Sequence, residues 1–347
     1  MPPANTPRAR LELLDVLRGL AVVLMIHTHV SNAWVSQAAR AGRVFALEGW
    51  TFALPSRLFL LLLGASLAAA WHRAGGDARA LRLSALRRAA ELVALGFALR
   101  LHDWWSHGMS EPLRLWKVDI LPCLGLSALV CALLASRAGR PAPLRAVAAA
   151  AAAVVLGAWL GGEPGPAAVP APAWAYVAGP RPLAWFPLLP WCAFALAGVW
   201  AGDLLVRRGH ARDAGPLGAA LLALGAGAAA LSPAGPARWH DAEADPRTAV
   251  ALLGALLVVA AVTARALPWL PAPLRAALVL LGKGSLPIYV VHLGIVYGKR
   301  AAVLEGRLGL PGAALGTLSV TVAMMGFAWA WARASAAIRG RTLRLRP

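Results

Sequence analysis

The stretch LLDVLRGLAVVLMIHTH, residues 13–29, is long and apolar enough to cross a membrane, yet it carries four ionisable side chains. Such groups are costly in hydrocarbon, so they usually face a bundle interior or a wet cavity. At about 100° per residue, Arg18 lies roughly 20° and Asp15 roughly 40° from His29 around the helix. His27 projects from roughly the opposite side to Arg18. A polar stripe is therefore predicted on one face, with Arg18 and His29 about 16 Å apart along the axis.

The composition fits a membrane protein. Of the 347 residues, 59% are hydrophobic and only 14% are charged, and long uncharged runs recur throughout the chain. These features favour one polytopic transmembrane domain over residues 1–347, an all-α bundle, rather than two soluble domains. The first apolar run is too long and too charged for a cleavable signal peptide.

About ten transmembrane helices are predicted. The two weakest assignments are the third segment, which contains Arg100, and the fifth, which is short. The segments are 14–35, 52–71, 85–102, 118–136, 146–160, 183–206, 214–231, 248–265, 275–298 and 312–332.

Basic residues alternate between the two sides of these spans. One set of loops and termini carries 20 arginines, and the opposite set carries 10 basic residues. The positive-inside rule therefore places both termini in the cytoplasm. The cytoplasmic (inner) membrane is the expected location. The same distribution explains the net charge of +19 without a nucleic-acid partner. Membrane lipids are the expected surroundings.

Three titratable side chains are predicted at one outer level of the membrane. His29 lies late in the first span, Asp119 opens the fourth, and His292 lies late in the ninth. A neutral histidine with a partner on its other ring nitrogen is a common general base, so these residues are the candidate catalytic group. The alternatives are an interfacial carboxylate beside Lys117 for Asp119 and a packing histidine for His292.

The cytoplasmic side has a different chemistry. Loop 72–88 concentrates five arginines, including Arg79 and Arg82. The guanidinium fork binds phosphate oxygens, so with Arg18 these residues are candidates for a phosphate-rich ligand. They equally suit membrane orientation and anionic headgroups, and the Asp15–Arg18–His29 stripe equally suits packing between helices.

The three cysteines, Cys123, Cys131 and Cys192, are odd in number and lie inside apolar segments. Neither a disulfide framework nor a metal-binding spacing follows from them, and buried small side chains are expected.

Four stretches in order resemble the integral-membrane acyltransferases typified by the catalytic domain of heparan-α-glucosaminide N-acetyltransferase, and more distantly the acyltransferase-3 family. The first is Asp15–Ala21 with Leu24, Met25 and His29, in which Arg18 and His29 have the acyltransferase-3 spacing. The others are Asp119–Leu126, Phe186–Trp191 and Leu281–His292.

The resemblance implies transfer of an acyl group, with acetyl expected, from cytoplasmic acyl-coenzyme A to an extracytoplasmic sugar amine or hydroxyl. It implies acyl-coenzyme A as co-substrate, a carbohydrate or glycan acceptor and no metal. His29 would act as base, oriented by Asp119 or His292, and Arg18, Arg79 and Arg82 would hold the donor. The competing hypothesis is a polytopic transporter or lipid flippase that uses the Asp15/Arg18/His29 stripe as a relay.

Overall fold

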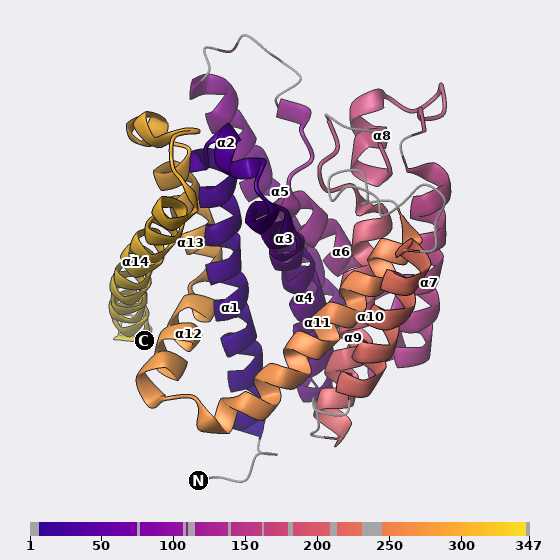
Figure 1. The fold of residues 1–347 in the computed structure, drawn as a ribbon. Helices are drawn as coiled ribbons and strands as arrows, with labels where there is room; N and C mark the ends of the chain where they lie inside the picture. The colour runs from indigo at the N-terminus through magenta and orange to yellow at the C-terminus, as the bar shows by residue number, and fades with distance from the viewer. Residues whose placement is uncertain are drawn as a thin grey trace. The chain divides into compact units, whose positions relative to one another are not determined.

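The computed structural model describes residues 7–74, 77–106, 109, 115–137, 140–161, 163–179, 183–208, 214–230 and 245–344. These residues are almost entirely helical, which confirms the predicted all-α class; β1 (Ser136–Arg137) and β2 (Arg140–Pro141) form a minimal antiparallel hairpin. The three cysteines are buried and free. The helices are α1 (Pro7–Trp34), α2 (Gln37–Arg40), α3 (Arg43–Phe52), α4 (Leu54–Arg73), α5 (Ala78–Ser106), α6 (Ile120–Leu134), α7 (Pro143–Leu160), α8 (Ala171–Val177), α9 (Leu188–Arg208), α10 (Ala214–Ala230), α11 (Pro246–Ala266), α12 (Ala272–Lys283), α13 (Ser285–Val296) and α14 (Leu310–Arg344), with 3₁₀ turns η4 (Leu267–Trp269) and η5 (Lys299–Leu304) (Figure 1).

The chain is a multi-pass membrane protein. Among the described residues, six helical segments are long and apolar enough to cross a membrane, or up to seven if α12 and α13 count as one broken span. Two shorter apolar helices lie within α6 and α10. Every predicted span overlaps a helix, but α5, with charges at both ends, is not among these candidate spans. The count of ten spans and the orientation of the termini stay predictions.

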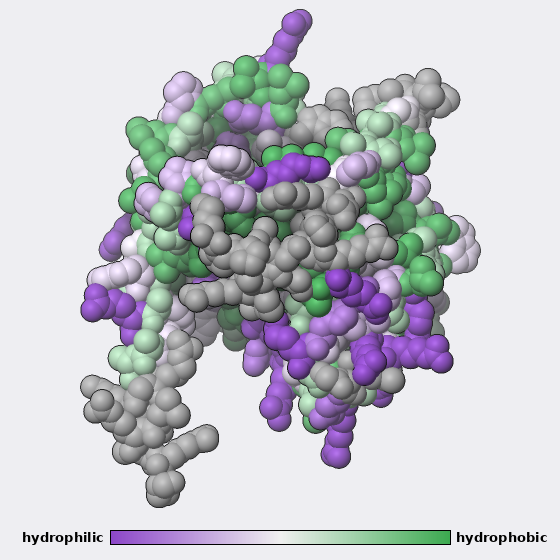
Figure 2. Space-filling view, turned by 90° about the horizontal axis from the view of Figure 1, so that it is seen from below, coloured by the Kyte–Doolittle hydropathy of each residue, from purple (hydrophilic) through white to green (hydrophobic). Residues whose placement is uncertain are grey.

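Exposed apolar side chains support this assignment. Leu144 is 84% exposed and Trp269 is 86% exposed, and α14 exposes several further large apolar residues along its length. Figure 2 shows green hydrophobic surface beside purple hydrophilic groups on the face that it views. Large apolar side chains exposed in this number are expected on a surface that faces lipid rather than water.

The chain divides into two compact units. Unit 1 comprises Met1–Arg10 and Arg57–Ala264, and unit 2 comprises Leu11–Ser56 and Arg265–Pro347. The organisation as a single transmembrane acyltransferase domain stays a prediction.

Unit 1 is held together by close helix packing. Helix α6 packs against α5 and α9, and α7 packs against α9. A Cβ at Gly64 of α4 would collide with the Ala195 carbonyl of α9, and one at Gly198 would collide with the Leu61 carbonyl. Small residues let helix backbones approach closely in lipid, where helix association depends on such packing. These glycines therefore fix the contact between α4 and α9.

Unit 2 is built around α1. A Cβ at Gly19 would collide with the Leu278 carbonyl of α12, and one at Gly282 would collide with the Asp15 carbonyl, so α1 and α12 touch backbone to backbone. Helices α12 and α13 both contact α14. The first predicted span is one unbroken helix, as expected.

The predicted continuous span 275–298 is wrong in one respect, because it consists of two helices, α12 and α13, bent by 84°. The bend falls at Gly284, between Lys283 at the end of α12 and Ser285 at the start of α13. Pro287 explains it, because in an unbroken helix its ring would clash with the Lys283 carbonyl and leave that carbonyl without an amide donor. In the first turn of α13, proline loses no hydrogen bond.

Candidate active site

Two histidines from α1 and α13 meet in unit 2. His29 Nδ1 lies 2.6 Å from His292 Nε2, and the two ring planes are inclined by only 7°. The ring centroids are 4.9 Å apart, which is the N···N distance plus one ring radius at each end. The rings therefore face each other edge to edge in nearly one plane, the arrangement of an in-plane N–H···N hydrogen bond.

The partners of His292 define which nitrogen carries each proton. His292 is fully buried, and its Nδ1 lies 2.9 Å from the Ile288 carbonyl oxygen, which can only accept a hydrogen bond. His292 Nδ1 is therefore the protonated nitrogen, and in the neutral ring Nε2 is the acceptor. His29 must then donate from Nδ1, which makes its Nε2 the nitrogen with the lone pair. This is the tautomer that a general base at His29 requires.

Several contacts hold α13 against α1 beside this pair. The Trp34 indole, near the end of α1, donates to the Val296 carbonyl at 3.0 Å. The Tyr289 ring lies beside that of His292, with ring centroids 5.7 Å apart. Tyr297, directly after α13, places its ring 5.8 Å from that of His29 at an angle of 64°. Each histidine of the pair thus has a tyrosine ring beside it.

His27 faces different neighbours, as the helical phase predicts. Its ring lies 5.6 Å from Phe52 of α3, and its Nε2 lies 4.0 Å from a Glu48 carboxylate oxygen. Its Nδ1 is 3.5 Å from the Thr317 hydroxyl of α14. His29 contacts α13 instead, so the two histidines lie on different faces of α1.

The two charges at the other end of the predicted stripe pair with each other. Arg18 donates to Asp15 across one helical turn at 2.6 Å, and the Arg18 side chain is 27% exposed. Nearby, Arg275 of α12 lies 3.3 Å from Glu12 of α1. The carboxylate of Asp15 offsets the charge that Arg18 would offer to a phosphate.

Asp119 belongs to unit 1, where it is the N-cap of α6. Its Oδ1 accepts from the Ile120 amide at 2.6 Å, and its Oδ2 accepts from Arg100 at 2.7 Å. The Asp119 side chain is only 8% exposed, so the arginine offsets the cost of burying its charge. The predicted proximity of Asp119 to His29 and His292 stays a prediction.

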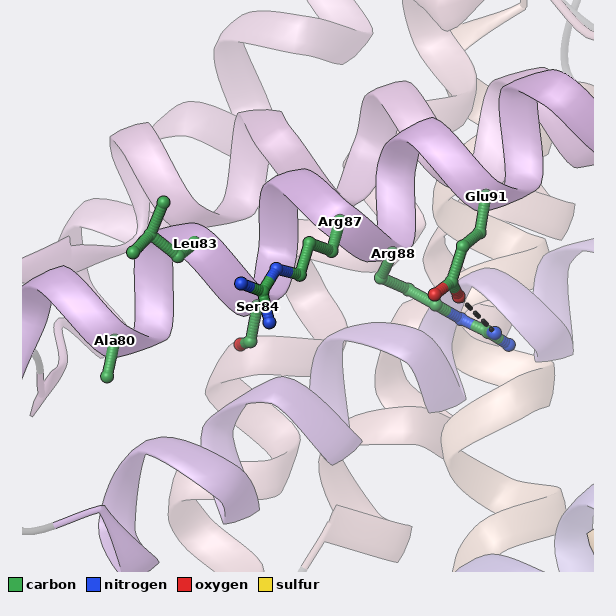
Figure 3. A pocket seen from close by; sticks show the side chains of 6 residues that line it. All are labelled: Ala80, Leu83, Ser84, Arg87, Arg88 and Glu91. Carbon is green, nitrogen blue, oxygen red and sulfur yellow. Dashed lines mark hydrogen bonds and ion pairs between the residues drawn. The ribbon is translucent and has the colours of Figure 1, made fainter.

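Arg79 and Arg82 are exposed on the first turns of α5, which begins after Asp77. The Asp77 carboxylate caps the helix by accepting from the Arg79 and Ala80 amides at 3.1 and 3.0 Å. Further along α5, Arg87 and Arg88 line a cavity of about 460 Å³ together with Ala80, Leu83, Ser84 and Glu91 (Figure 3). Arg88 also pairs with Glu91 at 3.3 Å.

The sequence alone does not reveal the role of several residues that lie beside the predicted site residues. Arg100 was counted as a weakness of its span, although it is the partner of Asp119. Arg87 and Arg88 were counted with the basic loop, and Tyr297 carried no distinct signal beyond its position five residues after His292. The ion pair could have been suggested by the rarity of unpaired charges in apolar helices.

The stretch Phe186–Trp191 leads into α9, which begins at Leu188. Leu189 has non-helical angles, and the Leu189–Pro190 peptide bond is cis. Trp191 is 2% exposed, and the Arg57 guanidinium lies 4.2 Å from the centre of its ring. The first turn of α9 is thus interrupted at Leu189, and Trp191 packs in the core of unit 1.

These features define a class of protein, a multi-pass α-helical membrane protein with a paired-histidine site. Residues 10–230, more than half of the chain, match the family model described as the catalytic region of heparan-alpha-glucosaminide N-acetyltransferase. The chain belongs to this family of membrane acetyltransferases, which confirms the resemblance seen in the sequence. The matched region includes His29 and Asp119 and ends before His292. No curated protein matches the chain.

Proposed function

We propose that this protein transfers an acetyl group from cytoplasmic acetyl-coenzyme A to an amine or hydroxyl of an extracytoplasmic sugar across the cytoplasmic membrane. The acceptor nitrogen or oxygen attacks the thioester carbonyl carbon, a C–N or C–O bond forms and the C–S bond breaks. The acceptor proton passes to His29 Nε2 and from there to the departing sulfur. The products are the acetylated sugar and free coenzyme A.

The observation that carries the proposal is the 2.6 Å contact between His29 and His292. A general base needs a defined tautomer and a fixed ring. Two successive hydrogen bonds supply both, one between the Ile288 carbonyl and His292 and one between His292 and His29. His292 is accordingly a positioning residue, and His29 is the group that meets the acceptor. Asp119 is proposed as a further orienting carboxylate, from the resemblance in its stretch.

The donor site is proposed on the cytoplasmic side, where the sequence predicts the arginine-rich loop 72–88. Arg18 lies about 16 Å along α1 from His29, a separation that suits a long flexible arm between a nucleotide and its thioester. Because Asp15 pairs with Arg18, the exposed Arg79 and Arg82 of α5 supply most of the positive charge for the donor's phosphates. Acyl-coenzyme A is thus a co-substrate bound by charge at one end and reacting at the other.

The decisive test compares His29→Ala with His27→Ala in proteoliposomes that carry equal amounts of protein. Each is given acetyl-coenzyme A labelled in the acetyl group on one side and glucosamine on the other. His29→Ala should lower transfer by about 10²–10⁴-fold, the usual contribution of a general base, while insertion and Tm stay unchanged. His27→Ala should keep its transfer rate within about tenfold of that of the unchanged protein, because the contacts of His27 are packing contacts.

Two results would contradict the proposal. Loss of transfer in His27→Ala together with normal transfer in His29→Ala would show that the face of α1 that carries His29 does not form the active site. Movement of the label into the lumen without acetylated sugar would favour the transporter hypothesis, in which the stripe is a relay.

A second test addresses the donor site. Arg79→Ala with Arg82→Ala should raise the KM for acetyl-coenzyme A and leave kcat nearly unchanged, the signature of lost uniform binding. The matched control is Arg87→Ala with Arg88→Ala, which removes the same charge from another part of α5. If only the control pair raises this KM, the donor binds at the cavity of Figure 3 and the assignment of Arg79 and Arg82 is wrong.

A further inference from the structure

Tyr297 occupies an unusual position beside the histidine pair. Its ring contacts the ring of His29 edge-on, with centroids 5.8 Å apart, yet the residue is 55% exposed. His292 by contrast is fully buried, and Tyr289 is 9% exposed. Among the aromatic residues described around this pair, Tyr297 is therefore the one that a molecule arriving from outside unit 2 can reach.

The backbone at Tyr297 is firmly held. Its amide donates to the Leu293 carbonyl at 2.9 Å, and the preceding carbonyl, that of Val296, accepts from Trp34. After η5, the Gly306 and Leu308 amides donate to the Ala33 and Trp34 carbonyls at 3.0 and 2.8 Å. The segment that carries Tyr297 is thus tied to the end of α1 on both sides, which presents the ring in a fixed place.

Arg40 adds a fixed positive charge on this side. Its guanidinium donates to the Val35 and Asn32 carbonyls at 3.0 and 2.6 Å, which anchors it over the C-terminal end of α1. Because its hydrogen bonds go to backbone atoms, the charge is held at the end of α1, which Trp34 ties to the segment of Tyr297.

The geometry of the base limits where an acceptor can lie. The nucleophilic group must come within hydrogen-bond distance of His29 Nε2, because Nδ1 is occupied by His292. The rest of the acceptor must then extend over whatever borders the His29 ring. Tyr297 borders it and is exposed. Aromatic faces are large rigid surfaces with a polar tip and so suit a ligand that is apolar on one face and hydroxylated at its rim.

We infer that Tyr297 is the acceptor-binding wall of the His29 site, on which the sugar ring stacks while its amine or hydroxyl meets Nε2. This inference rests on the proposed function. Tyr297 acts as a specificity-determining residue, since a flat aromatic wall favours a pyranose ring over a flexible amine of equal basicity. The fixed charge of Arg40 favours the neutral, nucleophilic form of an incoming amine over its ammonium form.

The test measures the KM for glucosamine and for acetyl-coenzyme A separately in Tyr297→Phe, Tyr297→Leu and Tyr297→Ala. Loss of the ring should raise the glucosamine KM by about tenfold or more in the Leu and Ala variants and leave the donor KM unchanged. Tyr297→Phe keeps the ring and should restore a glucosamine KM within about threefold of the unchanged protein. Trp329→Ala is the matched control, because Trp329 is exposed to a similar degree, 56%, on α14.

Three outcomes would overturn the inference. An unchanged glucosamine KM in the Leu and Ala variants would show that the acceptor does not touch Tyr297. A joint shift of both KM values and Tm would assign Tyr297 to structure or to membrane anchoring. Failure of the unchanged protein to acetylate any sugar would overturn the proposed function and this inference with it, whereas transfer with an unaltered acceptor KM would overturn the inference alone.

Discussion

The hydrogen bond from His29 to His292 leads to a prediction that distinguishes two roles of His292, orienting the His29 ring and packing in the core. His292→Met keeps an unbranched side chain of similar bulk but offers no strong acceptor to His29 Nδ1. His292→Gln keeps a carbonyl oxygen that can reach the same nitrogen. We expect the Met variant to lose much of its kcat and the Gln variant to lose clearly less than the Met variant, with both KM values little changed.

The size of the loss follows from the charge that develops on His29. In the transition state the base becomes an imidazolium, so its bond to His292 Nε2 turns into a hydrogen bond from a charged donor. Such bonds are worth about 1.5–3 kcal/mol. At 1.36 kcal/mol per factor of ten, the Met variant should lose about 10- to 150-fold in kcat. The Gln variant should lose no more than about tenfold, since its amide oxygen is a neutral acceptor at a similar place.

The assay is single-turnover transfer of labelled acetyl in detergent or proteoliposomes, with Tm measured on the same samples. Because His292 is fully buried, a modest drop in Tm is expected in both variants and decides nothing. Equal activity of the Met and Gln variants, whether both are high or both low at matched Tm, would refute the argument that His292 acts through an accepted hydrogen bond.

Three further predictions concern stability. Gly19→Ala should lower the free energy of unfolding by about 1–3 kcal/mol, because the added Cβ meets the backbone of α12. Gly326→Ala, whose Cβ has nothing within 4 Å, should raise it by about 0.5–1 kcal/mol. Equal Tm values for the two variants would contradict the close contact at Gly19. Burial acts to raise the pKa of Asp245 before α11, but hydrogen bonds from its neighbours outweigh it and lower the pKa below 3.8. That stabilisation is present above pH 3.8 and is lost as the pH falls through the lowered pKa, so Asp245→Asn should flatten the acid side of the Tm curve. Asp119→Asn and Arg100→Gln should couple by about 1 kcal/mol in a double-mutant cycle, and strict additivity would show that their ion pair is without effect.

Helical periodicity predicted the face of α1 because one unbroken helix carries every residue of the stripe. Phase alone separates His29, which meets α13, from His27, which meets α3 and α14. The same reasoning placed His29 and His292 at one depth, but it could not predict a direct bond between them. Depth fixes one coordinate, and the rotation of α13 about its axis depends on packing that the sequence pattern does not encode.

Hydropathy predicted the late apolar segment as one span, and it missed the bend for a physical reason. Hydropathy averaged along the sequence reports only the transfer free energy of the side chains, and both α12 and α13 are apolar. The break is a backbone property set by Gly284 and Pro287. The ion pair of Asp119 with Arg100 was missed similarly, because its two members lie 19 residues apart and on different elements.

The identity of the residue behind the base follows from its surroundings. A carboxylate behind His29 would hold the ring in the same tautomer, but it would bring a net charge into an apolar bundle, and such a charge is costly unless it is paired. His292 provides the acceptor without a charge, since its own proton is bound by the Ile288 carbonyl, whose second lone pair is available beside the helix bond. Under the proposed function, the pair therefore becomes charged only while His29 holds the acceptor's proton. Passing that proton to the departing thiolate discharges both groups at once, so in the proposed reaction the leaving group returns the buried site to neutrality.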